Sequence, residues 1–293
     1  MHKPVLLKEV VANIRIPAGG VLLDGTLGGG GHSEAIANNA GGKITIVGID
    51  QDSIALKKVE NLLGPIPGKL ILQKGNFRNL DKVLKDNGIG EVDGIILDLG
   101  FSSDQIADSG RGFSFMKDEP LIMTLDDSPT EDVLTARDVV NLWQRENLEL
   151  IFRNYGEEKR ARKIVDAIIS GRAKKKIETS GELAKIIEGA IGRRGKIHPA
   201  TKVFQAIRIA VNDELGALTE VLPKALSVLK KGSRLAIISF HSLEDRIVKR
   251  FFREKANQGQ VILINKKPII ADEEEIVLNP RARSAKLRII EKI

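Results

Sequence analysis

The feature that most constrains the fold is an alternation of short apolar runs and helical segments over the first hundred residues. Four runs are rich in β-branched residues and bounded by glycine, proline or acidic residues: Val21–Leu23, Ile44–Ile49, Leu70–Leu72 and Gly94–Leu97. Segments with helical periodicity separate them at 33–39, 53–63 and 80–86. Short apolar runs of this kind are typical of buried parallel strands. The alternation therefore predicts an α/β fold with a doubly wound, Rossmann-like sheet.

The alternation stops near residue 108 and resumes near residue 198. Between these points the periodicity is helical, at 139–154, 157–170 and 180–190, with no convincing strand. Further along, we expect helices from about Ala200 and from Leu243, and strands at 234–238, 261–264 and 287–290. The acidic run Asp272–Glu275 indicates an exposed turn. The sequence thus predicts a discontinuous sheet domain, 1–107 with 198–293, and an inserted all-helical domain at 108–197.

The net charge of +7 is unevenly distributed along the chain. Residues 108–150 carry −6, whereas 151–197 and 230–293 carry +7 each. Solvated helix faces would give similar basic clusters. Two basic blocks in one chain nevertheless favour a phosphate-rich ligand, bound across the basic part of the inserted domain and the C-terminal third. We therefore expect the inserted domain to recognise a nucleic acid substrate.

Composition excludes several kinds of chemistry. The chain has no cysteine and four histidines, so it has no disulfides, no thiolate nucleophile and no cysteine-based metal site, and nothing in it resembles a metal-ligand cluster. No apolar stretch approaches the roughly 18 residues of a spanning helix, and the first residues form no apolar signal-peptide core. We expect a cytoplasmic protein with no membrane partner.

A glycine-rich turn, Asp24–Ser33, follows the first predicted strand and opens the first helix. Glycines allow close approach of backbone to a ligand, and the helix N-terminus offers unpaired N–H groups. The turn has Ser33 where a dinucleotide fingerprint has its last glycine, and it lacks the Gly-Lys-Ser/Thr of a phosphate loop. Asp24 would repel a pyrophosphate but attract a sulfonium group. The turn therefore favours S-adenosylmethionine as cofactor, with a nicotinamide cofactor as the remote alternative.

Three later strand ends supply groups that a nucleoside needs. Asp50 follows the second strand, where a carboxylate would accept both ribose hydroxyls. Phe77 follows the third strand and offers an apolar surface for adenine, and Asp98 closes the fourth. A helix cap, a core residue and a turn former are the ordinary interpretations of these three residues. Their occurrence at successive strand ends favours a binding site.

Methyl transfer from a sulfonium is an in-line displacement, so the enzyme mainly positions the nucleophile and excludes water. If the nucleophile is an exocyclic base amine, a group that accepts its proton makes the nitrogen lone pair more available. Asp98 lies where nucleic-acid amino-methyltransferases place such a group. It is our candidate catalytic residue as well as a candidate cofactor contact.

Two polar stretches provide candidates for RNA contact. In the helix from Ala200, an apolar stripe at 204, 207, 211 and 218 leaves a polar face that includes Arg208 and Asn212. A solvated helix face would look the same. The stretch Ser239–Arg246 has the pattern of polar site residues or of a helix N-cap with an acidic first turn. With the second basic block, these stretches give our candidate substrate-binding residues: Arg208, Asn212, His241, Arg246 and Arg283.

Motifs along essentially the whole chain resemble the bacterial small-subunit ribosomal RNA methyltransferase H family, formerly called MraW. These motifs are Pro4–Leu7, Asp24–Ser33, Asp98–Gly100, Arg111–Phe115, Tyr155–Glu158, His198–Thr201, Ile238–Arg246 and Arg281–Ser284. The resemblance implies a class I methyltransferase sheet and N4-methylation of a cytidine in the P-site region of 16S rRNA in the small ribosomal subunit, which tunes decoding. It also implies S-adenosylmethionine contacts at Gly30, Gly31, His32, Asp50, Phe77, Asp98 and Gln105.

One segment departs from the family pattern. Where the family usually has Asp and Arg in Pro-Leu-Asp-Met-Arg-Met-Asp, this chain has Ile122 and Thr124. If the usual Asp and Arg bind each other, their joint replacement is tolerable. If they contact substrate, we expect the replacement to affect activity or specificity. This departure gives one alternative, a related methyltransferase acting on another RNA or on DNA. A separate alternative is a non-catalytic, cofactor-sensing RNA-binding or assembly factor.

Overall fold

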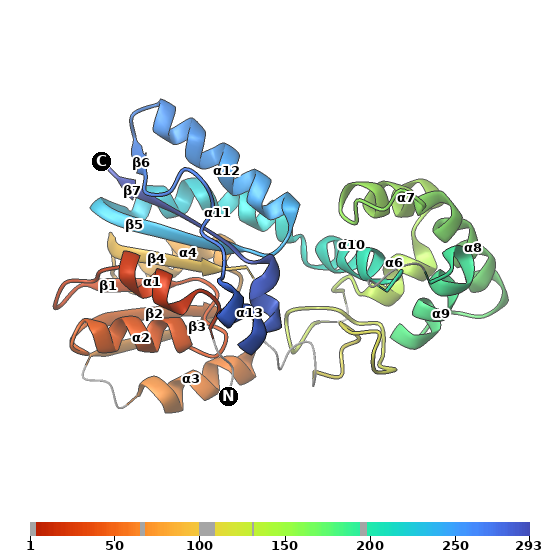
Figure 1. Ribbon diagram of the computed structural model, residues 1–293. Coiled ribbons are helices and arrows are strands. Elements are labelled where there is room, and N and C mark those ends of the chain that lie inside the picture. The colour runs from red at the N-terminus through yellow and green to blue at the C-terminus, as the bar shows by residue number, and fades with distance from the viewer. Residues whose placement is uncertain (1–3, 65–67, 100–108, 131, 194–197) are drawn as a thin grey trace. The chain divides into compact units, whose positions relative to one another are not determined.

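A computed structural model describes residues 4–64, 68–99, 109–130, 132–193 and 198–293. The chain forms two compact units, labelled by element in Figure 1. The sheet unit comprises Met1–Ser102 and Leu215–Ile293, and the helical unit comprises Ser103–Glu214. In the described part of the chain, no helix combines the length and apolar character that crossing a membrane requires.

The sheet unit contains seven strands in the order β3-β2-β1-β4-β5-β7-β6. The strands are β1 (Val21–Asp24), β2 (Thr45–Asp50), β3 (Lys69–Lys74), β4 (Val92–Asp98), β5 (Leu229–Ser239), β6 (Val261–Leu263) and β7 (Lys286–Lys292). Strands β1 to β5 pair in parallel, and β7 is antiparallel to both β5 and β6. This is the predicted doubly wound, Rossmann-like sheet, and all seven predicted strands are confirmed.

Apolar residues on the two faces of the sheet form two separate cores, as the alternation of side chains along a strand requires. Leu22 and Ile96 belong to the core under α1 (Leu7–Asn13), α2 (Gly31–Asn39) and α3 (Ser53–Leu63). Leu23 and Ile95 belong to the opposite core, under α4 (Leu80–Asp86), α11 (Glu214–Val228) and α12 (Ser242–Asn257). The helices therefore cover both faces of the sheet (Figure 1). In open α/β sheets of this kind, ligands bind at the carboxyl ends of the parallel strands.

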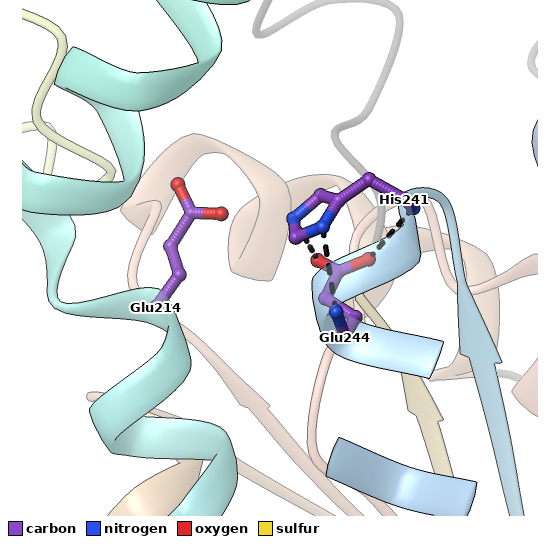
Figure 2. Close-up of side chains that lie close together, drawn as sticks. All are labelled: Glu214, His241 and Glu244. Carbon is purple, nitrogen blue, oxygen red and sulfur yellow. Dashed lines mark hydrogen bonds and ion pairs between the residues drawn. The ribbon is translucent and has the colours of Figure 1, made fainter. Parts of the chain in front are cut away.

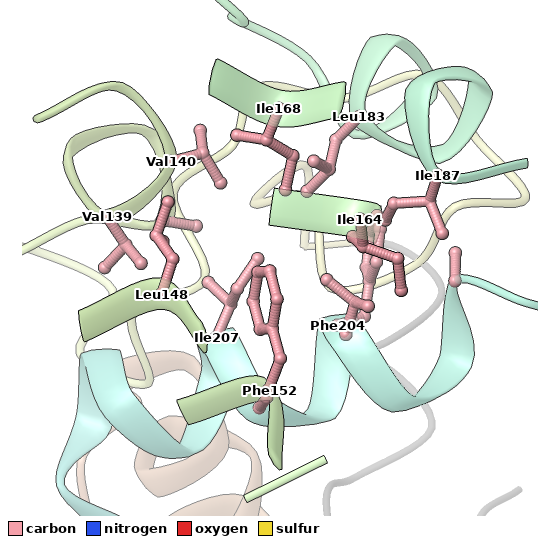
Figure 3. Packing of buried hydrophobic residues seen from close by; sticks show 14 of the residues in the cluster. Val139, Val140, Leu148, Phe152, Ile164, Ile168, Leu183, Ile187, Phe204 and Ile207 are labelled. Carbon is pink, nitrogen blue, oxygen red and sulfur yellow. The ribbon is translucent and has the colours of Figure 1, made fainter. Parts of the chain in front are cut away.

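The helical unit contains α6 (Ala136–Leu142), α7 (Arg145–Asn154), α8 (Ala161–Lys174), α9 (Ser180–Ile191) and α10 (Thr201–Asn212). The single helix predicted at 139–154 is wrong, because the backbone is extended at Trp143 and Gln144 and separates α6 from α7. Both helices contribute to one apolar core, which Figure 3 shows with Val139 and Val140 from α6 and Leu148 and Phe152 from α7.

The predicted domain boundary at 197/198 is wrong, because α10 packs into the helical unit. Phe204 and Ile207 project into the core of that unit (Figure 3). Asp213 adopts a left-handed conformation with φ of 47° and ends the helix, and α11 begins at the next residue. Leu218 on α11 instead packs in the sheet unit. The helical spacing of apolar residues continues past Asp213, but the helical backbone ends there. The sequence pattern therefore predicts one helix where the structure has two helices in different units.

The acidic run 272–275 is not simply an exposed turn. Asp272 accepts a 2.7 Å hydrogen bond from the Glu275 backbone and caps a short helix, α13 (Glu273–Leu278), which precedes the 3-10 helix η2 (Pro280–Ser284). Glu275 Oε1 accepts a 2.7 Å hydrogen bond from the backbone N–H of Leu6. The run therefore fixes the N-terminal segment, a long-range role that local sequence does not reveal.

Candidate functional site

The glycine-rich turn between β1 and α2 is hydrogen-bonded to both neighbouring strands. The Gly25 N–H donates to the Ile96 carbonyl of β4, and the Leu27 N–H donates to the Ile49 carbonyl of β2, each at 3.0 Å. The Thr26 hydroxyl accepts a 2.5 Å hydrogen bond from the Asp98 N–H. The turn thus lies over the carboxyl ends of β2 and β4, where open α/β sheets bind ligands.

Glycines in this turn serve two different purposes. Gly30 has a φ of 75°, and a β-carbon there would lie 2.9 Å from Val59 Cγ2. A β-carbon on Gly31 would lie 2.4 Å from Pro4 Cγ, so both positions need glycine for packing. Gly29 is exposed and has open space where a β-carbon would be. With no side chain capping α2 at Gly30, bare backbone and helix N–H groups remain available to a ligand.

Asp24 is a buried carboxylate at the start of the turn, with only 2% of its surface exposed. Its Oδ2 accepts a 2.7 Å hydrogen bond from the Ser33 hydroxyl, and its Oδ1 accepts one of 3.2 Å from the Thr26 N–H. Burial raises the pKa of Asp24 above its ordinary value, despite these hydrogen bonds. A ligand cation near this group would favour its ionised form.

Asp50 closes β2 and presents both carboxylate oxygens to the turn region. Oδ2 accepts a 2.8 Å hydrogen bond from the Gly28 N–H, and Oδ1 accepts one of 2.9 Å from the Asp52 N–H. Burial raises the pKa of Asp50 to about 6. Asp50 does not cap α3, because Asp52 accepts the capping hydrogen bond from Ile54. Each Asp50 oxygen keeps further acceptor capacity, as a pair of ribose hydroxyls would require.

The His32 side chain binds the N-terminal segment. Its Nε2 lies 2.9 Å from the Val5 carbonyl, and its Nδ1 lies 3.9 Å from Asp98 Oδ2. His32 is buried, whereas the Asp98 side chain is 19% exposed. A cofactor contact from His32 would therefore use its backbone, and Asp98 retains access to solvent or to a substrate.

Phe77 begins a 3-10 helix, η1 (Phe77–Asn79), and is half-buried. It packs against the core under α4, α11 and α12, and its Cβ would lie 3.3 Å from a β-carbon on Gly25. Phe77 is therefore partly a core residue and also lies beside the glycine turn. The predicted contact Gln105 lies outside the described residues.

The predicted substrate residues of α10 have structural partners in the helical unit. Asn212 Nδ2 donates to the Met123 carbonyl at 2.8 Å, and its Oδ1 accepts from the Leu125 N–H at 2.7 Å. Arg208 donates to both carboxylate oxygens of Glu214, each at 2.7 Å. Their roles in substrate binding stay predictions.

His241 caps α12, which was one of the two interpretations of its stretch. The Glu244 N–H donates to His241 Nδ1 at 3.4 Å, and the Glu244 carboxylate accepts from the backbone N–H of His241 at 3.2 Å (Figure 2). Arg246 is exposed on α12 and Arg283 is exposed on η2. Contacts of these three residues with RNA stay predictions.

Sequence reasoning missed Thr26 and Ser33 as groups that organise the site. Thr26 binds the backbone of Asp98, and Ser33 binds the carboxylate of Asp24. The available signals were Thr26, a hydroxyl residue inside the glycine turn, and Ser33, a hydroxyl residue nine positions after Asp24. Neither signal distinguishes such a contact from an ordinary turn or helix start.

The chain is similar in sequence to a known protein family over its full length. The family model described as the MraW methylase family matches residues 1–293. A ribosomal RNA small subunit methyltransferase H from Acetivibrio thermocellus is 47% identical over 312 residues, covering 100% of this chain and 99% of its own. One of that name from Persephonella marina is 45% identical over 295 residues, with 100% and 99% covered.

Among solved structures, an rRNA methylase from Streptococcus thermophilus is 12% identical, with a TM-score of 0.46 and coverage of 100% of this chain and 99% of its own. The family is shown by the full-length match to the family model and by the 45% and 47% identity to the two curated relatives. The chain, a methyltransferase by these matches, belongs to the MraW methylase family.

Proposed function

We propose that this protein transfers a methyl group from S-adenosylmethionine to the N4 amine of a cytidine in the P-site region of 16S rRNA, and thereby tunes decoding. The observation that carries the proposal is the convergence of the glycine turn, Asp50 and Asp98 at the carboxyl ends of β1, β2 and β4. The names of the relatives support the small-subunit rRNA as substrate.

The residues of the sheet unit fit this cofactor. Asp50 would accept the ribose hydroxyls, and the open backbone at Gly29 would border the methionine part. Phe77, beside Gly25, would border the adenine. The buried carboxylate of Asp24 would favour a nearby cation electrostatically. Gly30, Gly31 and the backbone of His32 would complete the cradle at the start of α2.

When bound, S-adenosylmethionine supplies an electrophilic methyl group. Transfer of this methyl group to the cytosine N4 atom would form an N–C bond and break the S–C bond of the sulfonium, and the amine would lose one proton. Asp98 is placed at the end of β4 by the hydrogen bond between its N–H and Thr26. Its partly exposed carboxylate would orient the amine and accept that proton. The protein otherwise contributes position and exclusion of water.

Ile122 and Thr124, which replace the family pair, both belong to the helical unit, where Ile122 is half-buried and Thr124 is buried. Thr124 is 2% exposed, and its hydroxyl donates a 3.0 Å hydrogen bond to the Asp126 carbonyl. The Thr124 carbonyl accepts a 2.9 Å hydrogen bond from the buried Arg111 guanidinium. A buried position of this kind supports a structural replacement over a change of target.

The test is to incubate the protein with methyl-labelled S-adenosylmethionine and small subunits that lack the modification. We expect label on the N4 atom of the P-site cytidine. In Asp98→Asn, which keeps the shape of the side chain at this candidate cofactor contact, we expect the loss of transfer to be much larger than any loss of cofactor affinity. Label on another base would establish the related-methyltransferase alternative. Cofactor and RNA binding without transfer in any assembly state would indicate a non-catalytic factor.

A further inference from the structure

A basic cavity in the helical unit carries chemistry that the cofactor site does not use. The cavity has a volume of about 350 Å³ and lies where α8 begins and α9 ends. Its lining residues are Arg160, Lys163, Ala190, Ile191, Gly192 and Arg193. Half of these residues are cationic and none of the six is acidic, so the lining favours an anion.

One of the three cations is held by the protein itself. Arg160 Nη1 donates a 3.0 Å hydrogen bond to the Ile191 carbonyl at the end of α9. Its Nε lies 3.5 Å from Oε1 of the buried Glu158. Arg160 thus offsets the Glu158 carboxylate and the negative end of α9, and it forms part of the wall of the cavity.

The other two cations remain available to a ligand. Lys163 and Arg193 are exposed, and within the described ranges neither side chain has a hydrogen bond or ion pair. The N-terminus of α8 has no side-chain cap and no acidic residue in its first turn. Two uncompensated cations and the positive end of a helix therefore meet at one cavity.

We propose that this cavity binds a phosphate of the RNA backbone, with Lys163 and Arg193 as its ligands. The inference rests on the proposed rRNA methyltransferase function. Lys159 and Arg162 are exposed and extend the positive surface next to Arg160 and Lys163. A positive surface larger than the cavity favours a polyanion as the ligand over a small molecule with a single carboxylate. The lining contains no aromatic residue. The contact would therefore set the position of the RNA without reading its bases.

The experiment compares Lys163→Gln and Arg193→Gln, singly and together, with Lys185→Gln as the matched control. Lys185 is exposed on α9 of the same unit, has no partner in the described part of the chain, and does not line the cavity. Binding to protein-free 16S rRNA is measured as a function of salt concentration. Each cavity substitution should reduce the slope of log K against log salt by about 0.7 to 0.9. The double variant should bind about tenfold more weakly near 0.1 M salt.

Three further measurements keep the outcome interpretable. Unchanged melting temperature and cofactor affinity in the variants would show that the fold and the cofactor site are intact. Bound rRNA should protect Lys163, but not Lys185, from an amine-reactive reagent. If the wild type binds rRNA and the cavity variants keep its slope, the inference is wrong and the proposed function stands.

Two other results separate the remaining explanations. If the variants weaken binding to intact small subunits but not to protein-free rRNA, the cavity contacts a ribosomal protein and the inference is wrong. If the wild type binds neither rRNA nor small subunits, the proposed function fails, and the inference fails with it.

Discussion

At the scale of single residues, we expect Asp50 to make the proposed cofactor binding sensitive to pH. Its pKa is raised to about 6 by burial, and a protonated carboxyl cannot accept hydrogen bonds through both oxygens. Affinity for S-adenosylmethionine should therefore rise as the pH rises through about 6. For one protonation step, affinity at pH 5 should be about tenfold below the plateau. Calorimetric titration from pH 5 to 8 measures this.

The control for this prediction is Asp50→Ala, which should bind the cofactor more weakly and with a flatter pH profile. An unchanged profile in the variant would assign the titration to another group. The raised pKa of Asp50 has the opposite effect on the stability of the free protein, which should fall as the pH rises. The contribution of Asp50 to the stability of the free protein is complete below its ordinary pKa of 3.8 and is lost as the pH rises through about 6.

Two adjacent glycines should separate stability from ligand binding. Gly30→Ala places a β-carbon 2.9 Å from Val59 Cγ2 at a φ of 75°. The left-handed conformation alone should lower the free energy of unfolding by about 1–2 kcal/mol. Gly29→Ala meets open space, so its stability should stay within about 0.5 kcal/mol of wild type while its cofactor affinity falls. Denaturant unfolding and calorimetry measure the two effects, and equal stability losses would contradict this division.

At the scale of secondary-structure elements, Asn212 connects α10 to the segment 123–125. Asn212→Ala removes hydrogen bonds to Met123 and Leu125 and leaves backbone groups of the segment unpaired. We expect a loss of about 2–3 kcal/mol in unfolding free energy. Asn154→Ala is the matched control, because Asn154 is exposed in the same unit and has no described partner. Equal stability of the two variants in denaturant unfolding would contradict the connection.

Elements also show what sequence could and could not predict. The strands were predictable because runs such as Ile44–Ile49 are buried on both faces and need no distant partner to be recognised. The assignment of α10 failed because periodicity does not register the single left-handed residue Asp213. Asp24 and Asp50 could be placed at strand ends, but their burial and raised pKa values depend on packing from several elements.

At the scale of the whole molecule, we expect cofactor binding and RNA binding to be separable. Neutralising Lys174 and Lys176 should weaken RNA binding and reduce its salt dependence, with little effect on cofactor affinity. The Lys175 substitution should weaken RNA binding less, because the Lys175 Nζ already donates a 2.6 Å hydrogen bond to Glu182. This hydrogen bond is the main cause that lowers the pKa of Glu182 to about 2. Salt titrations of the three single Lys→Gln variants test this order. An equal slope change in all three would contradict it.

The sheet order has a consequence for synthesis on the ribosome. Strand β4 ends at Asp98, and its partner β5 begins at Leu229, with 130 residues between them. At about 5–20 residues per second, roughly 7–26 seconds separate the emergence of these two strands. During that interval β4 is an unpaired edge, and such edges favour pairing with other chains. We therefore expect the nascent protein to pass through a period in which its glycine-rich turn has been synthesised but β4 still lacks its partner strand β5 and can pair with other chains.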